Sequence, residues 1–269
     1  MLVTISQDYQ FNYVLIGDRQ KPVIVFLHGF MGSCHDFSVV IEQLSEFCCL
    51  VVDLPGHGRT EVRHDANYQM PPIAKALTAL LEQLNIEKCC LVGYSMGGRL
   101  ALYLGVHFPQ YFSKVVLESA SPGLKTQPER DRRIAQDLQL IRKLESVELA
   151  QFIRQWYANP LFESFVQHPN YCQAIAQRLN NNPFKLAKSL RYMGLGVQPS
   201  LWNNLREIQI PLILIVGSLD VKFVTINQNI ANSCSSARLN IVENTGHNVH
   251  FEQPKKFSDL IKHLRIIAG

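Results

Sequence analysis

The sequence predicts an α/β fold: a mostly parallel central sheet, helices on both of its faces and an inserted α-helical cap. Two observations predict it. Short continuous apolar runs recur along the chain and are mostly separated by helical segments. One region, residues 122–204, interrupts this alternation with helix-like segments alone. Strands that alternate with helices are typical of a parallel sheet that helices cover on both sides.

The expected strands are apolar runs rich in β-branched residues, which suits strands buried on both faces. They are PVIVFLHG (22–29), FCCLVVD (47–53), CCLVG (89–93), KVVLES (114–119), PLILIVG (211–217) and ARLNIVE (237–243). Residues 2–16 alternate around polar residues and predict an antiparallel hairpin. The expected core helices cover about 36–46, 71–84, 97–108, 225–233 and 254–265.

The interruption divides the chain into a first core part (1–121), a cap insertion (122–204) and a second core part (205–269). Apolar residues in the insertion recur every three or four positions, which predicts helices in PERDRRIAQDLQLIRKL and SVELAQFIRQWY and near 170–180 and 184–193. Ligands bind at the carboxyl ends of the strands in open α/β folds. Because the insertion is rich in arginine and aromatic residues, we expect it to cover that end. The alternative is a helical subdomain that only packs.

Composition excludes several classes of function. The 26 Lys and Arg residues against 22 Asp and Glu give a formal charge of +4 without a basic block, so we expect no nucleic-acid partner. The apolar stretches are far shorter than the roughly 18 residues of a membrane span, so we expect no membrane insertion. The first residues have no basic start followed by an apolar core, so we expect no signal peptide.

The seven cysteines predict a cytoplasmic protein. Their number is odd, two adjacent pairs lie inside apolar runs, and no spacing is typical of a zinc site or of CxxC. Buried free thiols imply a reducing compartment. We find no metal-ligand cluster, and we expect neither a metal nor an organic cofactor. We expect a monomer or a weak homo-oligomer.

The stretch GYSMG, residues 93–97, carries the main chemical signal. It fits G-x-S-x-G between an expected strand and an expected helix, where the serine lies on a strained turn that exposes its hydroxyl. The flanking glycines remove side chains that would clash in that turn. We therefore expect Ser95 at a catalytic centre. The alternative is a tightly packed glycine turn that happens to hold a serine.

An acid and then a histidine should follow the serine along the chain. Asp220 comes directly after the PLILIVG strand, and His247 lies in the loop after the last strand. Taken singly, Asp220 could be a helix cap and His247 a loop histidine, but together they fit the expected order. His250 is a weaker alternative for the base, because it is closer to the following helix. A serine hydroxyl needs a histidine to take its proton, and the histidine needs the acid to fix its tautomer.

Two backbone N–H groups should form an oxyanion hole. One belongs to the residue after the serine, Met96, and the other to the loop LHGFMGS, where Phe30 is the candidate. Together, FLHGF, DLPGHG, GYSMGG, Asp220 and the GHN at His247 resemble the α/β-hydrolase superfamily across the whole core. This resemblance implies the α/β-hydrolase fold.

Arginines near the expected pocket favour an anionic substrate. Arg99 lies one helical turn after Ser95 on the same helix face, and the cap contributes ERDRR (129–133) and QRLNNNPF (177–184). Guanidinium groups bind carboxylates in a bidentate manner and stay charged. The alternative for each arginine alone is a solvated position or a pair with a nearby acid.

Several stretches resemble one family within the superfamily, the 2-succinyl-6-hydroxy-2,4-cyclohexadiene-1-carboxylate synthases of menaquinone and phylloquinone biosynthesis. They are LHGFMGS, GYSMGGRLALYL, ESASPGL, ERDRR, QWYANPLF, RLNNNPF, GVQPSLWNNL, DVKF and GHNVHFEQP, and they extend from about residue 24 to 256. In the stretch GSCHDF, Cys34 and Phe37 stand where a small residue and a tryptophan are expected, at positions that we expect to border the pocket mouth.

This resemblance implies a carbon–oxygen lyase that eliminates pyruvate from an enolpyruvyl cyclohexene with three carboxylates. It implies that Ser95, backed by His247 and Asp220, abstracts a ring proton, and that Phe30 and Met96 hold the resulting enolate. The positions that it places on the substrate are Tyr94, Arg99, Arg133, Trp156 and Arg178. Arg133 has neighbours, Arg130 and Arg132, that a small register error would exchange for it. Trp156 could instead be an aromatic residue of the cap core.

Two other functions use the same residues differently. A serine hydrolase of esters, thioesters or carbon–carbon bonds in anionic substrates would need the same three catalytic residues, so the core does not exclude it. A non-catalytic binding protein would need none of them, and the joint presence of Ser95, Asp220 and His247 argues against it.

Overall fold

The apolar runs form the strands of a single sheet. The computed structural model describes residues 1–263, and the nine strands in that range belong to one sheet. The strands are β1 (Leu2–Thr4), β2 (Tyr9–Ile16), β3 (Val23–Leu27), β4 (Cys48–Val52), β5 (Glu61–Val62), β6 (Cys89–Tyr94), β7 (Phe112–Glu118), β8 (Leu212–Gly217) and β9 (Ala237–Val242). Their order is β1-β2-β4-β3-β6-β7-β8-β9, with β5 beside β2.

The first strands pair antiparallel and the others pair parallel. β2 runs antiparallel to β1, β4 and β5, whereas every neighbouring pair from β4 to β9 is parallel. The predicted hairpin and the mostly parallel sheet are therefore confirmed.

Helices cover both faces of the sheet. The core helices are α1 (Ser38–Ile41), α2 (Met70–Gln83), α3 (Met96–His107), α9 (Val221–Ser233), α10 (Val249–Glu252) and α11 (Pro254–His263). Successive strand residues point to opposite faces. Val25 and Leu27 of β3 accordingly share a buried cluster with α2, α3 and α9. Ile24 and Phe26 of the same strand share the opposite cluster with α1 and α11.

Two predicted helix boundaries are wrong. The helix expected over about 36–46 is only the four residues of α1, because beyond it Gln43, Leu44 and Phe47 donate to carbonyls three residues back and form turns. These turns still bury Leu44, so the apolar spacing imitates a longer helix. The helix expected from 225 begins at Val221, because the Asp220 side chain accepts the N–H of Phe223 and caps it. The short helix α10 was not predicted, and residues 264–265 of the last expected helix lie outside the described range.

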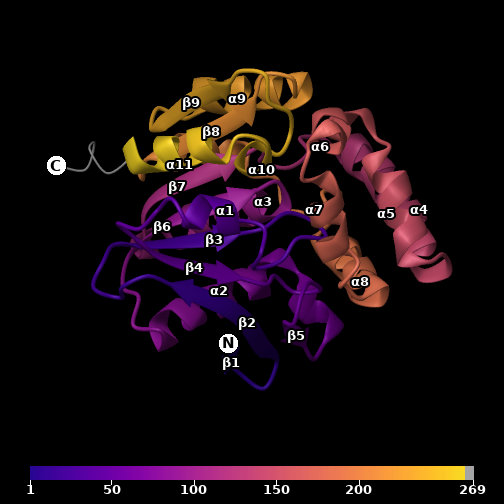
Figure 1. Cartoon of the computed structure of the whole chain (residues 1–269), viewed down its shortest axis with the longest axis horizontal. Coiled ribbons are helices and arrows are strands. Elements are labelled where there is room, and N and C mark those ends of the chain that lie inside the picture. Colours follow the sequence, from indigo (N-terminus) through magenta and orange to yellow (C-terminus); the bar gives the residue numbers. More distant parts are fainter. Residues whose placement is uncertain (264–269) are drawn as a thin grey trace.

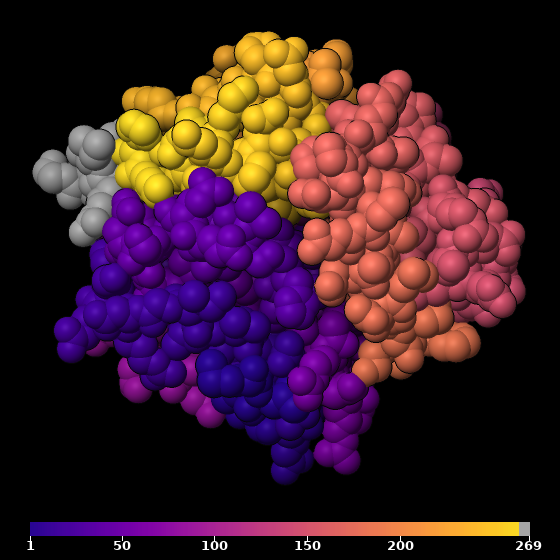
Figure 2. All heavy atoms as spheres, in the orientation of Figure 1, coloured from indigo at the N-terminus to yellow at the C-terminus, as the bar shows by residue number. Residues whose placement is uncertain are grey.

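Five helices without strands follow one another between β7 and β8. They are α4 (Gln127–Ser146), α5 (Leu149–Tyr157), α6 (Glu163–Gln167), α7 (Tyr171–Arg178) and α8 (Pro183–Met193). They lie together beyond one end of the sheet (Figure 1), and this salmon-to-orange segment packs against both the violet N-terminal and the yellow C-terminal part (Figure 2). A buried cluster of their own joins Phe152, Leu186 and Leu190 to Met31 of the core. The boundaries of the three-part division stay a prediction.

Glycines let α3 begin directly against the sheet. A Cβ at Gly97 would lie 2.2 Å from the carbonyl oxygen of Leu27, and a Cβ at Gly93 would lie 2.4 Å from the carbonyl oxygen of Gly97. Both distances are far below van der Waals contact with backbone atoms that cannot rotate away. A larger residue at either position would therefore push α3 away from β3 and β6, and with it Ser95 between them.

We expect Gly97→Ala to lower the free energy of unfolding by about 3 kcal/mol or more, because the added methyl group overpacks a backbone contact. Gly105→Ala in the same helix is the matched control, since the nearest atoms to its Cβ would belong to side chains, Val115 at 3.0 Å and Ile210 at 3.4 Å. Urea unfolding followed by circular dichroism measures both. Equal stability of the two variants would contradict the close-packing argument.

Candidate active site

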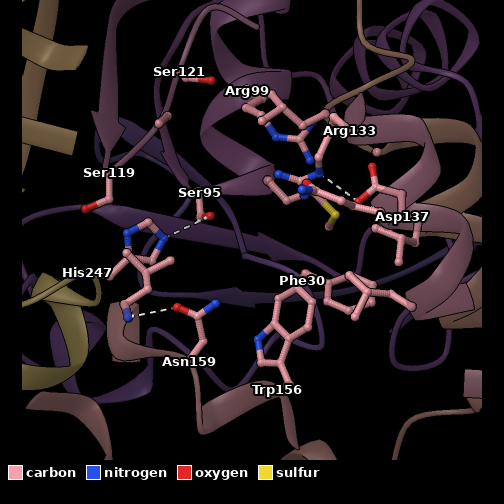
Figure 3. A pocket seen from close by; sticks show the side chains of 18 of the residues that line it. Phe30, Ser95, Arg99, Ser119, Ser121, Arg133, Asp137, Trp156, Asn159 and His247 are labelled. Atoms are coloured by element: carbon pink, nitrogen blue, oxygen red, sulfur yellow. Dashed lines mark hydrogen bonds and ion pairs between the residues drawn. The ribbon is translucent and has the colours of Figure 1, made fainter. Parts of the chain in front are cut away.

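Ser95 lies on a strained turn between β6 and α3. Its backbone has φ 49° and ψ −104°, in the left-handed half of dihedral space that residues other than glycine rarely occupy. Its N–H donates to the carbonyl of Glu118 at the end of β7 (2.8 Å). This is the geometry that the GYSMG pattern predicts, and it presents the Ser95 hydroxyl to a cavity beneath the helical insertion (Figure 3).

Asp220 and His247 complete a hydrogen-bonded chain to that hydroxyl. His247 Nε2 lies 3.2 Å from Ser95 Oγ, and His247 Nδ1 lies 2.6 Å from Asp220 Oδ2. Asp220 caps α9 directly after β8, and His247 lies in the loop between β9 and α10. Both side chains are buried. The histidine can thus exchange a proton with the serine while the aspartate orients it.

His250, the alternative base, faces away from Ser95. Its Nδ1 lies 2.7 Å from Glu118 Oε2, its N–H donates to Glu118 Oε1 (2.9 Å), and both side chains are buried. Among the described residues, His250 is not part of the wall around Ser95. The geometry therefore favours His247.

The cavity has a volume of about 400 Å³ and lies between the core and the helical insertion. In the described part of the chain, its wall includes five predicted residues besides the serine and the histidine, contributed by the core and the insertion together. The predicted residues in the wall are Ser95, His247, Phe30, Met96, Arg99, Arg133 and Trp156. Figure 3 shows Arg99 and Arg133 on one side of Ser95, and Phe30 and Trp156 on another.

Phe30 and Met96, the predicted oxyanion donors, both border this cavity. Met96 is the first residue of α3, so its N–H has no partner inside the helix. Phe30 follows β3, and its ring packs against Trp156 with 5.1 Å between the ring centroids. Trp156 therefore contacts the core loop as well as the other aromatic residues of its own helices.

Arg99 is held by neutral acceptors. Its Nη1 donates to Gln198 Oε1 (2.7 Å) and to the carbonyl of Met193 (3.1 Å), both from the helical insertion. Burial, together with the nearby Arg133 charge, lowers the pKa of Arg99 to about 9. The guanidinium therefore keeps its positive charge at neutral pH, and no acidic group forms a direct hydrogen bond with it among the contacts of residues 1–263.

Arg133 is the arginine of the ERDRR stretch that reaches the cavity. Its Nε donates to Asp137 Oδ1 (2.7 Å), one turn along α4, and both residues line the wall. Arg130 instead donates to the carbonyl of Gly196. Arg132 is exposed, and it is not among the described residues that line the cavity either.

Comparison with known proteins places this geometry in a family. A profile of the alpha/beta hydrolase fold family matches residues 22–254. The 2-succinyl-6-hydroxy-2,4-cyclohexadiene-1-carboxylate synthase of Salmonella typhimurium is 34% identical over 239 residues, which cover 88% of this chain and 91% of that one. The chain belongs to this synthase family. A Bacillus subtilis relative is 37% identical, with 96% of both chains aligned. The structure of MenH from S. aureus is 32% identical, with a TM-score of 0.88 over 96% of this chain and 97% of that one.

Two residues that the resemblance to the synthase family places on the substrate do not line the cavity. Arg178 is buried at the base of the cap, where its Nη1 lies 2.5 Å from Asp36 Oδ1, and Tyr157 accepts from its Nε (3.4 Å). Tyr94 lies beneath the wall, with its ring 5.5 Å from that of His247. The placement of these two side chains against the substrate stays a prediction. In the structure, a buried carboxylate pairs with Arg178 and the core packs around Tyr94.

The Asp36–Arg178 pair joins the cap to the core. Burial alone would raise the pKa of the Asp36 carboxyl, but the charge and hydrogen bond of Arg178 outweigh it and hold that pKa below its usual value. Burial likewise opposes the charge on Arg178, but Asp36 raises the pKa of its guanidinium. Both partners are therefore charged at neutral pH.

Cys34 and Phe37, expected at the pocket mouth, are also placed elsewhere. Both are buried in the core cluster that packs on α1 and α11. The reason is that the loop after β3 turns inward, so that Phe37 packs against Phe26 with 4.9 Å between ring centroids.

Other residues of the wall, chiefly Asp137 and Lys222, were not predicted from the sequence. Lys222 follows Asp220 by two positions at the start of α9, so its proximity to the predicted acid was an available signal. For Asp137, the available signal was its position four residues after Arg133, one helical turn along the chain.

In residues 1–263, no group of three or more His, Cys, Asp or Glu side chains is arranged to hold a metal ion. All seven cysteines are free thiols. None of the helices in the same range has the length and apolar character needed to cross a membrane.

We expect Asp36→Asn to lower the free energy of unfolding at pH 7 by about 3–5 kcal/mol, because it leaves the buried Arg178 charge without its partner. Since the folded pKa of Asp36 is depressed, its contribution is fully present above about pH 4 and is lost only as the pH falls through the folded pKa. The difference from wild type should thus be constant from pH 8 to pH 5 and shrink below. Urea unfolding across this series measures it.

Asp65→Asn is the control, because Asp65 pairs with Lys188 at the surface, where such pairs contribute about 1 kcal/mol at most. A stability difference for Asp36→Asn that grows as the pH falls would show that Asp36 does not carry the buried charge.

Proposed function

We propose that the protein eliminates pyruvate from 2-succinyl-5-enolpyruvyl-6-hydroxy-3-cyclohexene-1-carboxylate, giving 2-succinyl-6-hydroxy-2,4-cyclohexadiene-1-carboxylate in menaquinone or phylloquinone biosynthesis. One observation supports this most: Ser95 and His247, the latter backed by Asp220, line the same cavity as Arg99 and Arg133. Membership of the synthase family supports the same reaction.

The arginines match the charge of this substrate. It carries three carboxylates, and guanidinium binds carboxylate through paired hydrogen bonds. Within residues 1–263, the hydrogen-bond acceptors of Arg99 are neutral, so a substrate carboxylate would give it an anionic partner. Lys222 adds a third positive charge to the wall. A neutral ester would leave the Arg99 charge without an anionic partner, which disfavours a general esterase.

The serine acts as a base. Ser95 Oγ takes the proton from the ring carbon next to the succinyl ketone while His247 takes the hydroxyl proton, and Asp220 stabilises the imidazolium. The electron pair of the broken C–H bond moves onto the ketone oxygen and forms an enolate. When this electron pair returns from the enolate oxygen to the ring, the conjugated diene forms and the ring carbon–oxygen bond to the enolpyruvyl group breaks. The leaving pyruvate enolate takes a proton, which His247 can return, and becomes pyruvate.

The oxyanion donors act on the enolate. In the proposed mechanism, the N–H groups of Phe30 and Met96 hold the ketone oxygen as its charge develops. Such donors typically contribute a factor of about 100 to 1,000 in rate each. No covalent acyl-enzyme forms, and no cofactor takes part in the proton transfer.

A serine hydrolase is the second candidate, because the hydrogen-bonded triad and the strained Ser95 are equally suited to nucleophilic attack. In the lyase, the Ser95 oxygen removes a proton from the substrate, whereas in a hydrolase it attacks a carbonyl carbon.

Cytoplasmic location is proposed with this function. The free thiols of all seven cysteines support a reducing compartment. The oligomeric state stays a prediction.

The decisive assay mixes purified protein with freshly prepared enolpyruvyl substrate and follows pyruvate with lactate dehydrogenase, with p-nitrophenyl acetate in parallel. We expect rapid pyruvate release and negligible ester cleavage. Ser95→Ala should lower pyruvate release by at least about 1,000-fold, because it removes the catalytic base. Ester cleavage without pyruvate release would instead support the hydrolase.

Arg99→Ala should lower kcat/KM for pyruvate release by about 10- to 100-fold, because a charge-assisted hydrogen bond contributes about 1.5–3 kcal/mol. Arg133→Ala should do the same. Arg132→Ala is the matched control, since its side chain is exposed on the same helix outside the cavity wall. Equal kcat/KM for the three variants would mean that the arginines do not bind the substrate.

A further inference from the structure

Glu118, the last residue of β7, is a fully buried carboxylate that the proposed reaction does not use. A buried carboxylate is very unfavourable unless hydrogen bonds satisfy it. Here one residue satisfies both oxygens: His250 donates its backbone N–H to Oε1 (2.9 Å), and its ring Nδ1 lies 2.7 Å from Oε2. His250 is 132 positions further along the chain, so this contact ties two distant segments together.

The backbone of the same residue holds the serine. The carbonyl of Glu118 accepts the N–H of Ser95 at 2.8 Å, which extends the pairing of β6 with β7 by one residue into the turn. The left-handed backbone of Ser95 is costly and persists only where surrounding contacts fix it. Glu118 therefore fixes the serine through its main chain.

The side chain of Glu118 fixes the segment that carries the histidine. His247 lies three residues before His250, and α10 begins between them. The His250 ring is only 2% exposed, with its centroid 4.3 Å from that of Phe37 and 4.9 Å from that of Tyr94. The ring thus packs mainly against aromatic rings, and His250 also borders a second cavity that Asp36 and Arg178 line. Among the described residues, its ring hydrogen bond is to the carboxylate of Glu118.

We propose that Glu118 is a positioning residue for the proposed reaction. Its carbonyl fixes Ser95, its carboxylate fixes the His247 loop through His250, and the two together set the Ser95–His247 distance of 3.2 Å. A displacement of about 1 Å between reacting groups can lower a rate by roughly 100-fold. A carboxylate is suited to this task because its two oxygens constrain both the ring and the main chain of one partner, which an apolar contact does not.

The test compares three variants with wild type. Glu118→Leu removes both hydrogen bonds at similar side-chain volume. The double variant Glu118→Leu/His250→Phe replaces both polar partners with apolar groups, an exchange that is often neutral for stability. Leu80→Ala, in the buried face of α2, is the control for a loss of stability that does not involve the site. Each protein is assayed for Tm, for kcat and KM, and for the low-field proton resonance of the His247–Asp220 hydrogen bond.

We expect Glu118→Leu to lower Tm and to lower kcat by about 100-fold with KM within about twofold of wild type, since the arginines are untouched. In the double variant, Tm should recover while kcat stays low and the His247 resonance stays broadened or shifted. Leu80→Ala should lower Tm alone. If Glu118→Leu does not fold, the double variant is compared directly with wild type.

Recovery of kcat together with Tm in the double variant would show that Glu118 only stabilises the fold, and unchanged kcat in Glu118→Leu would overturn the proposal as well. The inference rests on the proposed function only for its kinetic assay. If wild type releases no pyruvate, the proposed function fails, whereas the His247 resonance, which needs no substrate, still tests the role of Glu118.

Discussion

The contact between Ser95 Oγ and His247 Nε2 is the constraint on which the rest of the site depends. It joins residues 152 positions apart, and at 3.2 Å it is close to the limit of a hydrogen bond. The serine side is fixed by the sheet, because Gly93 and Gly97 let α3 begin against β3 and β6. The histidine side is a loop, which by itself would be more mobile than a strand. It must therefore be attached to the sheet, and the buried carboxylates of Asp220 and Glu118 are its attachments.

The opposite side of the cavity imposes a different constraint. Arg99 carries a buried positive charge that only neutral groups accept, which is unfavourable until an anion arrives. Arg133, in contrast, already has the Asp137 carboxylate. The first arginine therefore gains more from a substrate carboxylate than the second, and Asp137 limits how much negative charge the second can accept. In the proposed function, this difference between the two arginines would orient a substrate with several carboxylates in the cavity.

Sequence alone predicted the parts of the site that local pattern determines. The strand–serine–helix pattern around Ser95 and the chain order of Asp220 and His247 each have a local signal, whereas Arg133 was implied by the resemblance. The residue pairs that hold these parts of the site together have no local signal in the sequence. Asp36 and Arg178 are 142 residues apart, and Glu118 and His250 are 132 apart. A buried ion pair of this kind depends on the packing of two surfaces, so a single sequence shows two unremarkable polar residues.

The helix expected over 36–46 illustrates the limit most clearly. The spacing of buried residues in turns can equal that of a helix, so the apolar pattern alone does not separate the two. Arg178 adds a contact that no pattern shows: its guanidinium pairs with a carboxylate in the core, while its predicted contact with the substrate stays a prediction.

The chemistry of Ser95 follows from these constraints rather than from the triad itself. A serine paired with a histidine can accept a proton or attack a carbonyl carbon, and the hydrogen bonds in the free protein are the same for both. What differs is the atom that the pocket holds within about 3 Å of the serine oxygen. If the arginines bind the carboxylates, the ring between them cannot turn freely, and the position of its acidic C–H bond is set by groups that never touch it. In the proposed function, the fold therefore supplies the base, and the charges of the cavity wall determine which reaction it performs.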